Sequence, residues 1–584
     1  MKSKKIIIGI VAAIALLCVV VGTFGVRWLI TRFGKNGGLF GDKSLIDDWK
    51  YASGRDYYDA VYESGAASSG DTFAAKSSNE LGLSVGGSKN VLNFRENIKN
   101  GYLPISTDIT YNGLFYDYYF NTGKTKPSED LFSPTYSTAV SKDPISGAYE
   151  YYMTVGLNSN IKESDFKRKK LNLVVVMDIS GSMSSSFNKY YYDRTNLENE
   201  EKYDNRSKMK VANESLNLLI DRLKPDDKLG IVLFDNAAYL AKPVNLVGET
   251  DVEKLKEHIL EIAPRGGTNF EAGYKEGTEL FTNEMLDDDE YENRIIVITD
   301  AMPNLGTTSK GNLTEYVKEN ADKGIYTSFI GVGVDFNTEV IECLSDVKGA
   351  NYYSVHNTDE FKKIMSDDFE YMVTPLVFDL ELKFDSSNYI IKNVYGTDAK
   401  EKNTGTLLKV NTLFPSSSNS SGEAKGGVVL IKIAPAIVDY NELGHEGTKI
   451  IVSYKDRDGK EHKNEQNITF DSRTEERYDN TGIRKAIALT RYANLMKDWI
   501  LFERSHRGTF QISTDTGIKD CPYMSYEEVR TLLGENERTS TKLNVSKEFS
   551  EVFAKFKEYM KNEIKEIGDE NMNQEIEILD LLVK

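Results

Sequence analysis

The stretch that decides the fold is LNLVVVMDISGSM, residues 171–183. Its first seven residues are almost all apolar, which is typical of a strand that is buried on both faces of a sheet. The strand ends at Asp178, and Ser180 and Ser182 follow at steps of two. Alternate side chains on a turn that leaves a strand can converge on one point, and Gly181 permits the tight bend. The stretch therefore predicts a buried strand with a polar site at its carboxyl end.

Residues 168–373 continue this alternation of apolar strands with amphipathic helical segments. Such alternation predicts an α/β fold with a doubly wound, mainly parallel sheet that is covered by helices on both faces. Sheets of this kind bind ligands at the carboxyl ends of their strands, where the winding reverses. We expect the further strands at 229–234, 295–299, 325–331 and 352–355, and helices near 252–261, 270–284, 311–323 and 358–366.

Two more polar residues are expected at the same edge of the sheet. Thr268 lies in a Gly-Gly-Thr-Asn loop before a helix, and Asp300 follows the strand at 295–299. Hydroxyl and carboxylate oxygens suit a small hard cation such as Mg²⁺, with Mn²⁺ or Ca²⁺ as alternatives. Two carboxylates balance a divalent charge, and one coordination position stays open for a partner's carboxylate. The predicted metal ligands are Asp178, Ser180, Ser182, Thr268 and Asp300.

These five residues resemble the metal-ion-dependent adhesion site of the von Willebrand factor A domain. The family pattern is Asp-x-Ser-x-Ser, then a Thr in a glycine-rich loop, then an Asp after a strand, and all five positions match in order. The resemblance implies a von Willebrand A-like fold, Mg²⁺ binding and recognition of protein ligands through an acidic side chain. The alternative is a scaffold whose site binds metal but recognises nothing.

One departure from the family pattern follows the second serine. Residues 184–206 intervene before a helix that we expect to begin near Ser207, and they include Tyr190, Tyr191 and Tyr192. Because aromatic residues anchor interfaces, our hypothesis is that this insertion shapes the choice of partner. A surface loop without such a role is the alternative.

Composition changes on both sides of the central domain. Residues 36–99 are rich in Gly, Ser, Asn and Asp and predict a flexible tether. Residues 100–167 predict an N-terminal β-rich flanking region, and 374–472 predict a β-sandwich. Residues 473–584 carry apolar stripes at helical spacing and predict a C-terminal helical region. Beyond the tether, the chain has an aromatic segment, a strand pair leading into the central domain, the sandwich and a helical region with Arg484-Lys485-Ala486-Ile487-Ala488-Leu489-Thr490-Arg491-Tyr492. With these features, most of the chain resembles bacterial proteins labelled calcium-activated chloride channel homologues, and its architecture also resembles inter-alpha-trypsin inhibitor heavy chains.

The N-terminus contains an apolar run at residues 6–26 without a charged residue. At about 1.5 Å per residue, a helix of this length crosses a hydrocarbon layer of ~30 Å. We therefore expect residues 1–35 to form an uncleaved, single-pass transmembrane anchor at the cell membrane, with the bulk of the chain extracellular. A cleaved signal peptide is the alternative. A single span gives no physical basis for a pore.

Charge and missing motifs narrow the function. Lys+Arg 72 against Asp+Glu 90 gives a net charge of −18, which argues against nucleic acid because phosphates would be repelled. The sequence has no phosphate-binding Gly-x-x-x-x-Gly-Lys-Ser/Thr loop, so no nucleotide is expected, and no His-Glu-x-x-His or Gly-x-Ser-x-Gly hydrolase motif. We expect a membrane-anchored surface protein, not an enzyme, that binds a protein ligand through Mg²⁺. The alternatives are a metal-sensing regulatory or assembly subunit of a membrane complex and, less favoured, an unrecognised hydrolase.

Overall fold

The structure is a computed structural model, and it describes part of the 584-residue chain. The described residues are 45–52, 80–123, 130–195, 206–386, 389–397, 407–435, 448–468, 475–505 and 535–583. The expected transmembrane run at 6–26 lies outside them. Within the described ranges, no helix is both long and apolar enough to cross a bilayer.

The chain divides into two compact units. Of the first, the structure describes residues 45–47 and Glu249–Asp251, where Ile46 and Thr250 form a parallel bridge. The second comprises Asp48–Gly248 and Val252–Lys584 and contains everything described below.

The central sheet of the second unit is mainly parallel, as expected from the sequence. Its strand order among the described residues is β2-β12-β11-β10-β7-β8-β9, and only the β8–β9 pair is antiparallel. The strands are β2 (Gly87–Ser88), β7 (Lys170–Asp178), β8 (Lys228–Phe234), β9 (Ala238–Leu246), β10 (Tyr291–Thr299), β11 (Ile325–Val332) and β12 (Asn351–Val355).

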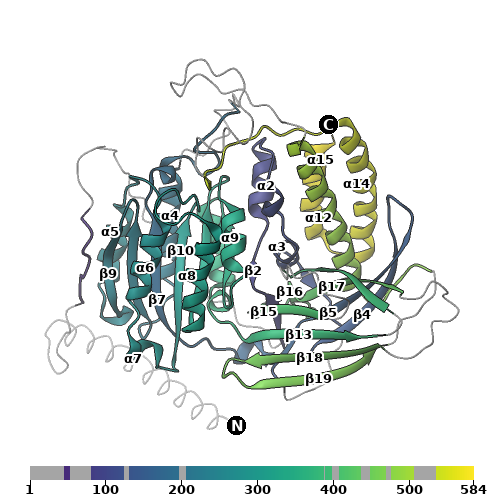
Figure 1. Ribbon diagram of the computed structural model, residues 1–584, viewed down its shortest axis with the longest axis horizontal. Helices are drawn as coiled ribbons and strands as arrows, with labels where there is room; N and C mark the ends of the chain where they lie inside the picture. Colours follow the sequence, from purple (N-terminus) through teal and green to yellow (C-terminus); the bar gives the residue numbers. More distant parts are fainter. Residues whose placement is uncertain are drawn as a thin grey trace, which may run out of the picture. The chain divides into compact units, whose positions relative to one another are not determined.

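Helices cover both faces of this sheet (Figure 1). Successive β7 side chains point to opposite faces, so Val175 and Met177 pack in one buried cluster and Val174 and Val176 in another. Helices α4, α5 and α10 contribute to the first cluster, and α6, α8 and α9 to the second. The helices are α4 (Lys208–Ile220), α5 (Val252–Leu260), α6 (Phe270–Glu279), α7 (Asn283–Leu286), α8 (Lys310–Asp322), α9 (Thr338–Ser345), α10 (Thr358–Asp367) and α11 (Phe369–Met372).

The winding of the sheet reverses between β7 and β10. From β7 the chain moves outward to β8 and β9, and it then returns to β10 on the other side of β7 before continuing to β11 and β12. Met177 pairs with Ile298 in parallel register, so the two strands end side by side. The carboxyl ends of β7 and β10 therefore flank the position where doubly wound sheets bind ligands.

Two antiparallel sheets form a β-sandwich around a shared apolar core. Their orders are β19-β18-β13-β15-β1-β6 and β14-β17-β5-β4-β20. The first sheet contains β1 (Glu80–Val85), β6 (Asn158–Lys162), β13 (Val377–Asp385), β15 (Leu407–Ser416), β18 (Thr448–Asp456) and β19 (Glu461–Ile468). The second contains β4 (Thr135–Lys142), β5 (Tyr149–Gly156), β14 (Tyr389–Tyr395), β17 (Val428–Pro435) and β20 (Arg477–Tyr478). Both sheets thus combine strands from before and after the central domain.

A helical layer packs against the second sheet (Figure 1). Trp499 of α12 meets Phe553 of α14 edge-on, with ring centroids 5.7 Å apart. The apolar stripes predicted from the sequence form much of this core, which also includes residues of two early helices. The layer consists of α12 (Thr481–Ser505), α14 (Lys547–Ile567) and α15 (Asn573–Leu582), with α2 (Leu92–Lys99) and α3 (Tyr111–Tyr116).

The structure differs from the expected tether at residues 80–99, which form β1, β2 and α2. Leu81 and Leu83 of β1 are 1% and 0% exposed, and β1 pairs with both β15 and β6. The apolar alternation in β1 is short, and the strands that pair with it are distant in sequence. The Gly- and Ser-rich composition around it therefore led to the wrong expectation of a tether. The helix expected at 270–284 is likewise two helices, because Thr282 caps the start of α7 at residue 283.

Candidate metal centre

Asp178 lies at the carboxyl end of β7 and is fully buried. Its Oδ1 accepts a hydrogen bond from the Ser180 backbone N–H at 2.8 Å. Its Oδ2 accepts one from the Thr299 hydroxyl of the neighbouring strand β10 at 2.6 Å. The carboxylate is therefore held in place by its own turn and by the adjacent strand.

The turn after β7 brings the two serine hydroxyls together. The Oγ atoms of Ser180 and Ser182 lie 3.1 Å apart, and both residues are buried. The Gly181 N–H donates to the Gly266 carbonyl at 2.9 Å, and a Cβ at position 181 would lie only 3.0 Å from that carbonyl oxygen. Glycine at 181 thus permits the close approach of the glycine-rich loop.

Thr268 lies on that glycine-rich loop and is also buried. Its backbone N–H donates to Asn304 Oδ1 at 2.8 Å, and its carbonyl accepts from the N–H groups of Asn304 and Leu305 at 3.0 and 3.2 Å. The loop is therefore fixed between the turn after β7 and the loop after β10.

Asp300 follows β10 directly and is fully buried. Its Oδ2 accepts a hydrogen bond from Lys208 Nζ at 2.8 Å, whereas its buried Oδ1 has no hydrogen-bond partner among the described residues. The next residue, Ala301, has a φ of 57°, a strained backbone conformation for a non-glycine residue. Local strain and an unpartnered buried oxygen are both features of functional sites.

Burial and charge raise the pKa values of the two carboxyl groups. Loss of solvent and the negative charge of Asp300 together raise the pKa of Asp178 to about 7. Burial also raises the pKa of Asp300, although the Lys208 ammonium and the Ser182 hydroxyl favour its ionised form. Two carboxylates that repel each other away from water are stabilised by a cation between them.

Two charged residues of the site were not predicted from the sequence. Lys208 of α4 is fully buried, and its Nζ lies 2.8 Å from an oxygen of Asp300 and 2.8 Å from one of Asp335. With Asp178, these groups make three carboxylates and one ammonium, a net charge of two negative units when all are ionised. Asp335 follows the Gly331-Val332-Gly333 turn at the carboxyl end of β11. This position after a parallel strand is the sequence signal that could have identified Asp335 as a residue of the site.

The inserted residues also reach this site. The Tyr191 backbone N–H donates to Asp335 Oδ2 at 2.9 Å, and a Cβ on Gly181 would lie 3.7 Å from the Tyr191 hydroxyl. The Tyr191 side chain is 43% exposed, and Gly266 and Asn304 are exposed as well. The five predicted ligands therefore lie just beneath a rim of exposed residues. Residues 196–205 of the insertion lie outside the described ranges.

The donors present fit a small divalent cation. The described residues contain no group of three or more His, Cys, Asp or Glu side chains placed to hold a metal, so hydroxyl oxygens would have to complete a shell at this centre. Asp300 Oδ1 is an unpartnered buried acceptor. The Ser180 hydroxyl interacts with Asp178 and the Ser182 hydroxyl with Asp300. Such a mixed set of hard oxygen donors suits Mg²⁺ or Mn²⁺.

Comparison with known proteins identifies the central domain. Residues 173–302 match the model of the von Willebrand factor type A domain. The chain is 24% identical to the uncharacterized protein YfbK of Escherichia coli over 236 residues, which cover 39% of this chain and 36% of that protein. It is 22% identical to inter-alpha-trypsin inhibitor heavy chain H1 of Sus scrofa over 218 residues, or 36% of this chain and 22% of that one. The chain thus contains a von Willebrand factor type A domain and spans about a third or less of these relatives.

Solved structures match at low identity. A von Willebrand factor type A protein from Catenulispora acidiphila is 14% identical with a TM-score of 0.38, and the match covers 71% of this chain and all of that chain. The ArnB paralog VWA2 from Sulfolobus acidocaldarius is also 14% identical, with a TM-score of 0.37 and coverage of 78% and 97%. The von Willebrand factor A domain predicted from the sequence is confirmed, and inter-alpha-trypsin inhibitor heavy chains match over 36–38% of this chain. The resemblance to chloride channel homologues stays a prediction.

Proposed function

We propose that the von Willebrand factor type A domain binds a divalent cation, with Mg²⁺ as the first candidate, and uses it to bind an acidic side chain of a partner protein. The observation that carries this proposal is the pair of fully buried carboxylates, Asp178 and Asp300, at the point where the sheet reverses its winding. Asp300 Oδ1 has no partner among the described residues, although it is buried. An unpartnered buried carboxylate oxygen is costly without a cation.

The chain's own residues prepare the site for this role. The Thr299 hydroxyl and the Ser180 N–H orient Asp178, while Lys208 fixes the other oxygen of Asp300. Ser180, Ser182 and Thr268 would add neutral oxygens. The ion supplies a positive charge that a partner's carboxylate can bind directly. In this role the site recognises a partner protein and carries out no catalytic step.

We also propose that the protein acts at the cell surface, held by residues 6–26 as a single transmembrane span with the bulk of the chain outside. The support is the uncharged apolar run itself. Protease treatment of intact cells tests this placement. Loss of the central domain with retention of an N-terminal membrane fragment is expected, and full protection of the domain would contradict it.

Calorimetry and thermal unfolding test the metal site directly. Wild-type protein should bind Mn²⁺ or Mg²⁺ at one site and unfold at a higher temperature when the ion is present, because a ligand that binds only the folded state stabilises it. Asp178→Asn should lose both effects. Asp289→Asn is the matched control, because Asp289 is exposed and lies just before the amino end of β10, away from the site. Equal ion binding by both variants would refute the proposed site.

Partner recognition needs a second measurement. A partner captured from an envelope extract should be retained by wild type and Asp289→Asn with Mg²⁺, and released by EDTA. Asp178→Asn should not retain it. Converting the captured partner's carboxylates to amides should abolish retention, and retention of the amidated partner would contradict the acidic-ligand part of the proposal.

A further inference from the structure

A C-terminal strap, residues 535–545, crosses from the central domain to the helical layer. The Ser540 N–H donates to the Tyr192 carbonyl at 3.3 Å, within the insertion that follows β7. Further along, the Leu103 N–H donates to Thr541 O at 2.7 Å, and the Leu543 N–H donates to Gly101 O at 2.8 Å. Backbone bonds therefore hold residues 540–543 of the strap between the insertion and the segment around residues 101–103.

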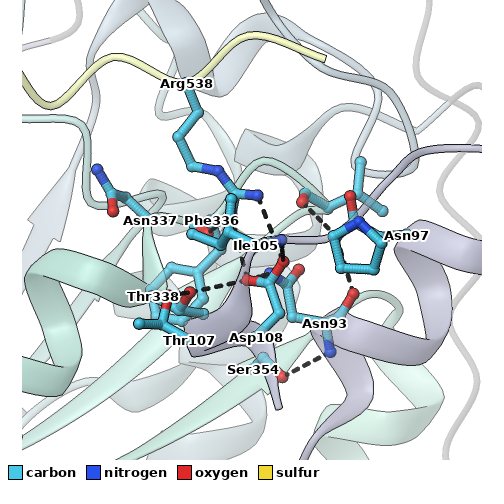
Figure 2. A network of polar contacts seen from close by, with 12 residues as sticks. Asn93, Asn97, Ile105, Thr107, Asp108, Phe336, Asn337, Thr338, Ser354 and Arg538 are labelled. Atoms are coloured by element: carbon cyan, nitrogen blue, oxygen red, sulfur yellow. Dashed lines mark hydrogen bonds and ion pairs between the residues drawn. The ribbon is translucent and has the colours of Figure 1, made fainter. Parts of the chain in front are cut away.

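A buried arginine anchors the middle of the strap (Figure 2). Arg538 is 8% exposed, and its guanidinium donates to the Phe336 carbonyl and, at 2.9 Å, to the Tyr190 hydroxyl. It also pairs with Asp108 at 3.4 Å. The same Asp108 carboxylate accepts hydrogen bonds from Asn93 and Thr338 at 2.9 and 2.7 Å.

Asn536 holds the strap against the loop that follows Asp300. Its Nδ2 donates to the carbonyls of Pro303 and Thr308 at 3.2 and 2.8 Å, and its own carbonyl accepts from Asn337 Nδ2 at 2.7 Å. Glu537 lies between Asn536 and Arg538, two buried residues with specific partners, so its backbone has little freedom.

Glu537 lies at the rim of the metal centre. Its Oε1 accepts hydrogen bonds from the Tyr192 hydroxyl at 2.8 Å and from Asn304 Nδ2 at 3.0 Å. The other end of the same Asn304 amide accepts from the N–H of Thr268, a predicted metal ligand. The side-chain amide of Asn304 therefore bridges the Glu537 carboxylate and the backbone N–H of Thr268.

Tyr192 also links Glu537 to the centre. Burial, followed by the hydrogen bond and the charge of Glu537, raises the pKa of the Tyr192 hydroxyl, and the charge of Asp300 adds to this effect. One side chain therefore lies within the fields of both carboxylates. Among the described residues, Glu537 forms no ion pair with a Lys or Arg.

We propose that Glu537 is an internal ligand of the metal centre. Its carboxylate takes the coordination position that the five predicted ligands leave open, and the carboxylate of a partner has to displace it. This inference rests on the proposed function and adds the group against which a partner competes. Its support is a half-buried carboxylate with two neutral donors on one oxygen, held by an anchored strap beside a site suited to a cation.

The test measures Mn²⁺ bound to the full-length protein in detergent, with water-proton relaxation to report the coordinated waters. Glu537→Gln should bind Mn²⁺ several-fold more weakly than wild type, and its relaxivity should rise by the contribution of about one water. Added acetate should lower the relaxivity of Glu537→Gln, because it fills the vacated position, and leave wild type unchanged. Glu535→Gln is the matched control, because Glu535 is exposed and lies two residues away on the same strap.

The outcomes separate this inference from the proposed function. If Glu537→Gln equals wild type in Mn²⁺ affinity, relaxivity and response to acetate while Asp178→Asn loses Mn²⁺, Glu537 is not a ligand but the metal site stands. If wild type binds Mn²⁺ no better than Asp178→Asn, both proposals fall. Should Glu537→Gln unfold, Glu537→Asp retracts the carboxylate by one methylene while keeping its charge, and the same increase in relaxivity is expected.

Discussion

Removal of the Lys208 ammonium should destabilise the central domain strongly, and a divalent cation should reverse much of the loss. Lys208 and its partners Asp300 and Asp335 have fully buried side chains. Lys208→Met keeps most of the side-chain volume but leaves two facing carboxylates without their shared counter-charge. Breaking a buried ion pair by removing one partner costs about 3–5 kcal/mol. We expect a loss of that size in the metal-free protein.

Hydrogen–deuterium exchange resolves this effect within a chain of several parts, where a single unfolding transition would be hard to assign. Amides of β7 and β10 should exchange roughly a hundred-fold faster or more in metal-free Lys208→Met, since each 1.4 kcal/mol is about a factor of ten. Mg²⁺ should slow them more in the variant than in wild type, because the variant site carries one more negative charge.

The control for this experiment lies on the same helix. Lys210 is exposed, so Lys210→Met should change the exchange rates of β7 and β10 little. If Lys208→Met exchanges within threefold of wild type without metal, the buried ammonium does not offset these carboxylates and our charge account of the centre is wrong.

Two further predictions follow from the geometry of the site. The pKa of Asp178 in the folded, metal-free protein is raised from 3.8 to about 7, so the folded state binds a proton at this carboxylate more tightly than the unfolded state. The contribution of Asp178 to stability, measured as the difference between wild type and Asp178→Asn, should therefore fall as pH rises from about 4 to 7 and level off above. Mn²⁺ affinity measured by calorimetry should rise over the same interval, and a wild type–variant difference that does not change with pH would contradict a raised Asp178 pKa. Gly181→Ala would place a Cβ 3.0 Å from the Gly266 carbonyl, so it should displace the Thr268 loop and reduce the Mg²⁺-dependent rise in unfolding temperature. Gly311→Ala in α8 meets no atom within 4 Å and should keep that rise, so equal behaviour of the two variants would show that the close approach does not matter.

The sequence predicted those parts of the structure whose signal is local. The apolar run before Asp178 and the strand before Asp300 both form central strands of the sheet, because burial on two faces requires continuous apolar residues. The same reasoning places both carboxylates at one edge. The five predicted ligands remain a prediction, although the structure brings Asp178, Ser180, Ser182 and Asp300 together and fixes the Thr268 loop beside them.

The remainder depended on contacts between distant residues, for which a sequence carries little local signal. Lys208 stands among the first residues of an amphipathic helix, where a lysine is ordinarily solvated, and only the fold shows that it reaches two buried aspartates. The two-residue strand β2 is too short for any periodicity. The contact between Glu537 and Asn304 joins residues 233 positions apart, and no motif marks either of them.

The way the central domain is held bears on how it can bind. Strand β6 leads into the domain and β13 leads out of it, and both belong to one sheet of the sandwich, so the two ends of the domain are fixed by the same sheet. The strap adds a third attachment at the site itself, through Asn536 and Arg538. Loops that are ordered before a partner arrives spare the entropy of ordering them on binding. If Glu537 occupies the open coordination position, the free energy needed to displace it offsets this entropic advantage. The affinity for a partner would then depend on how easily residues 535–545 move away from the site.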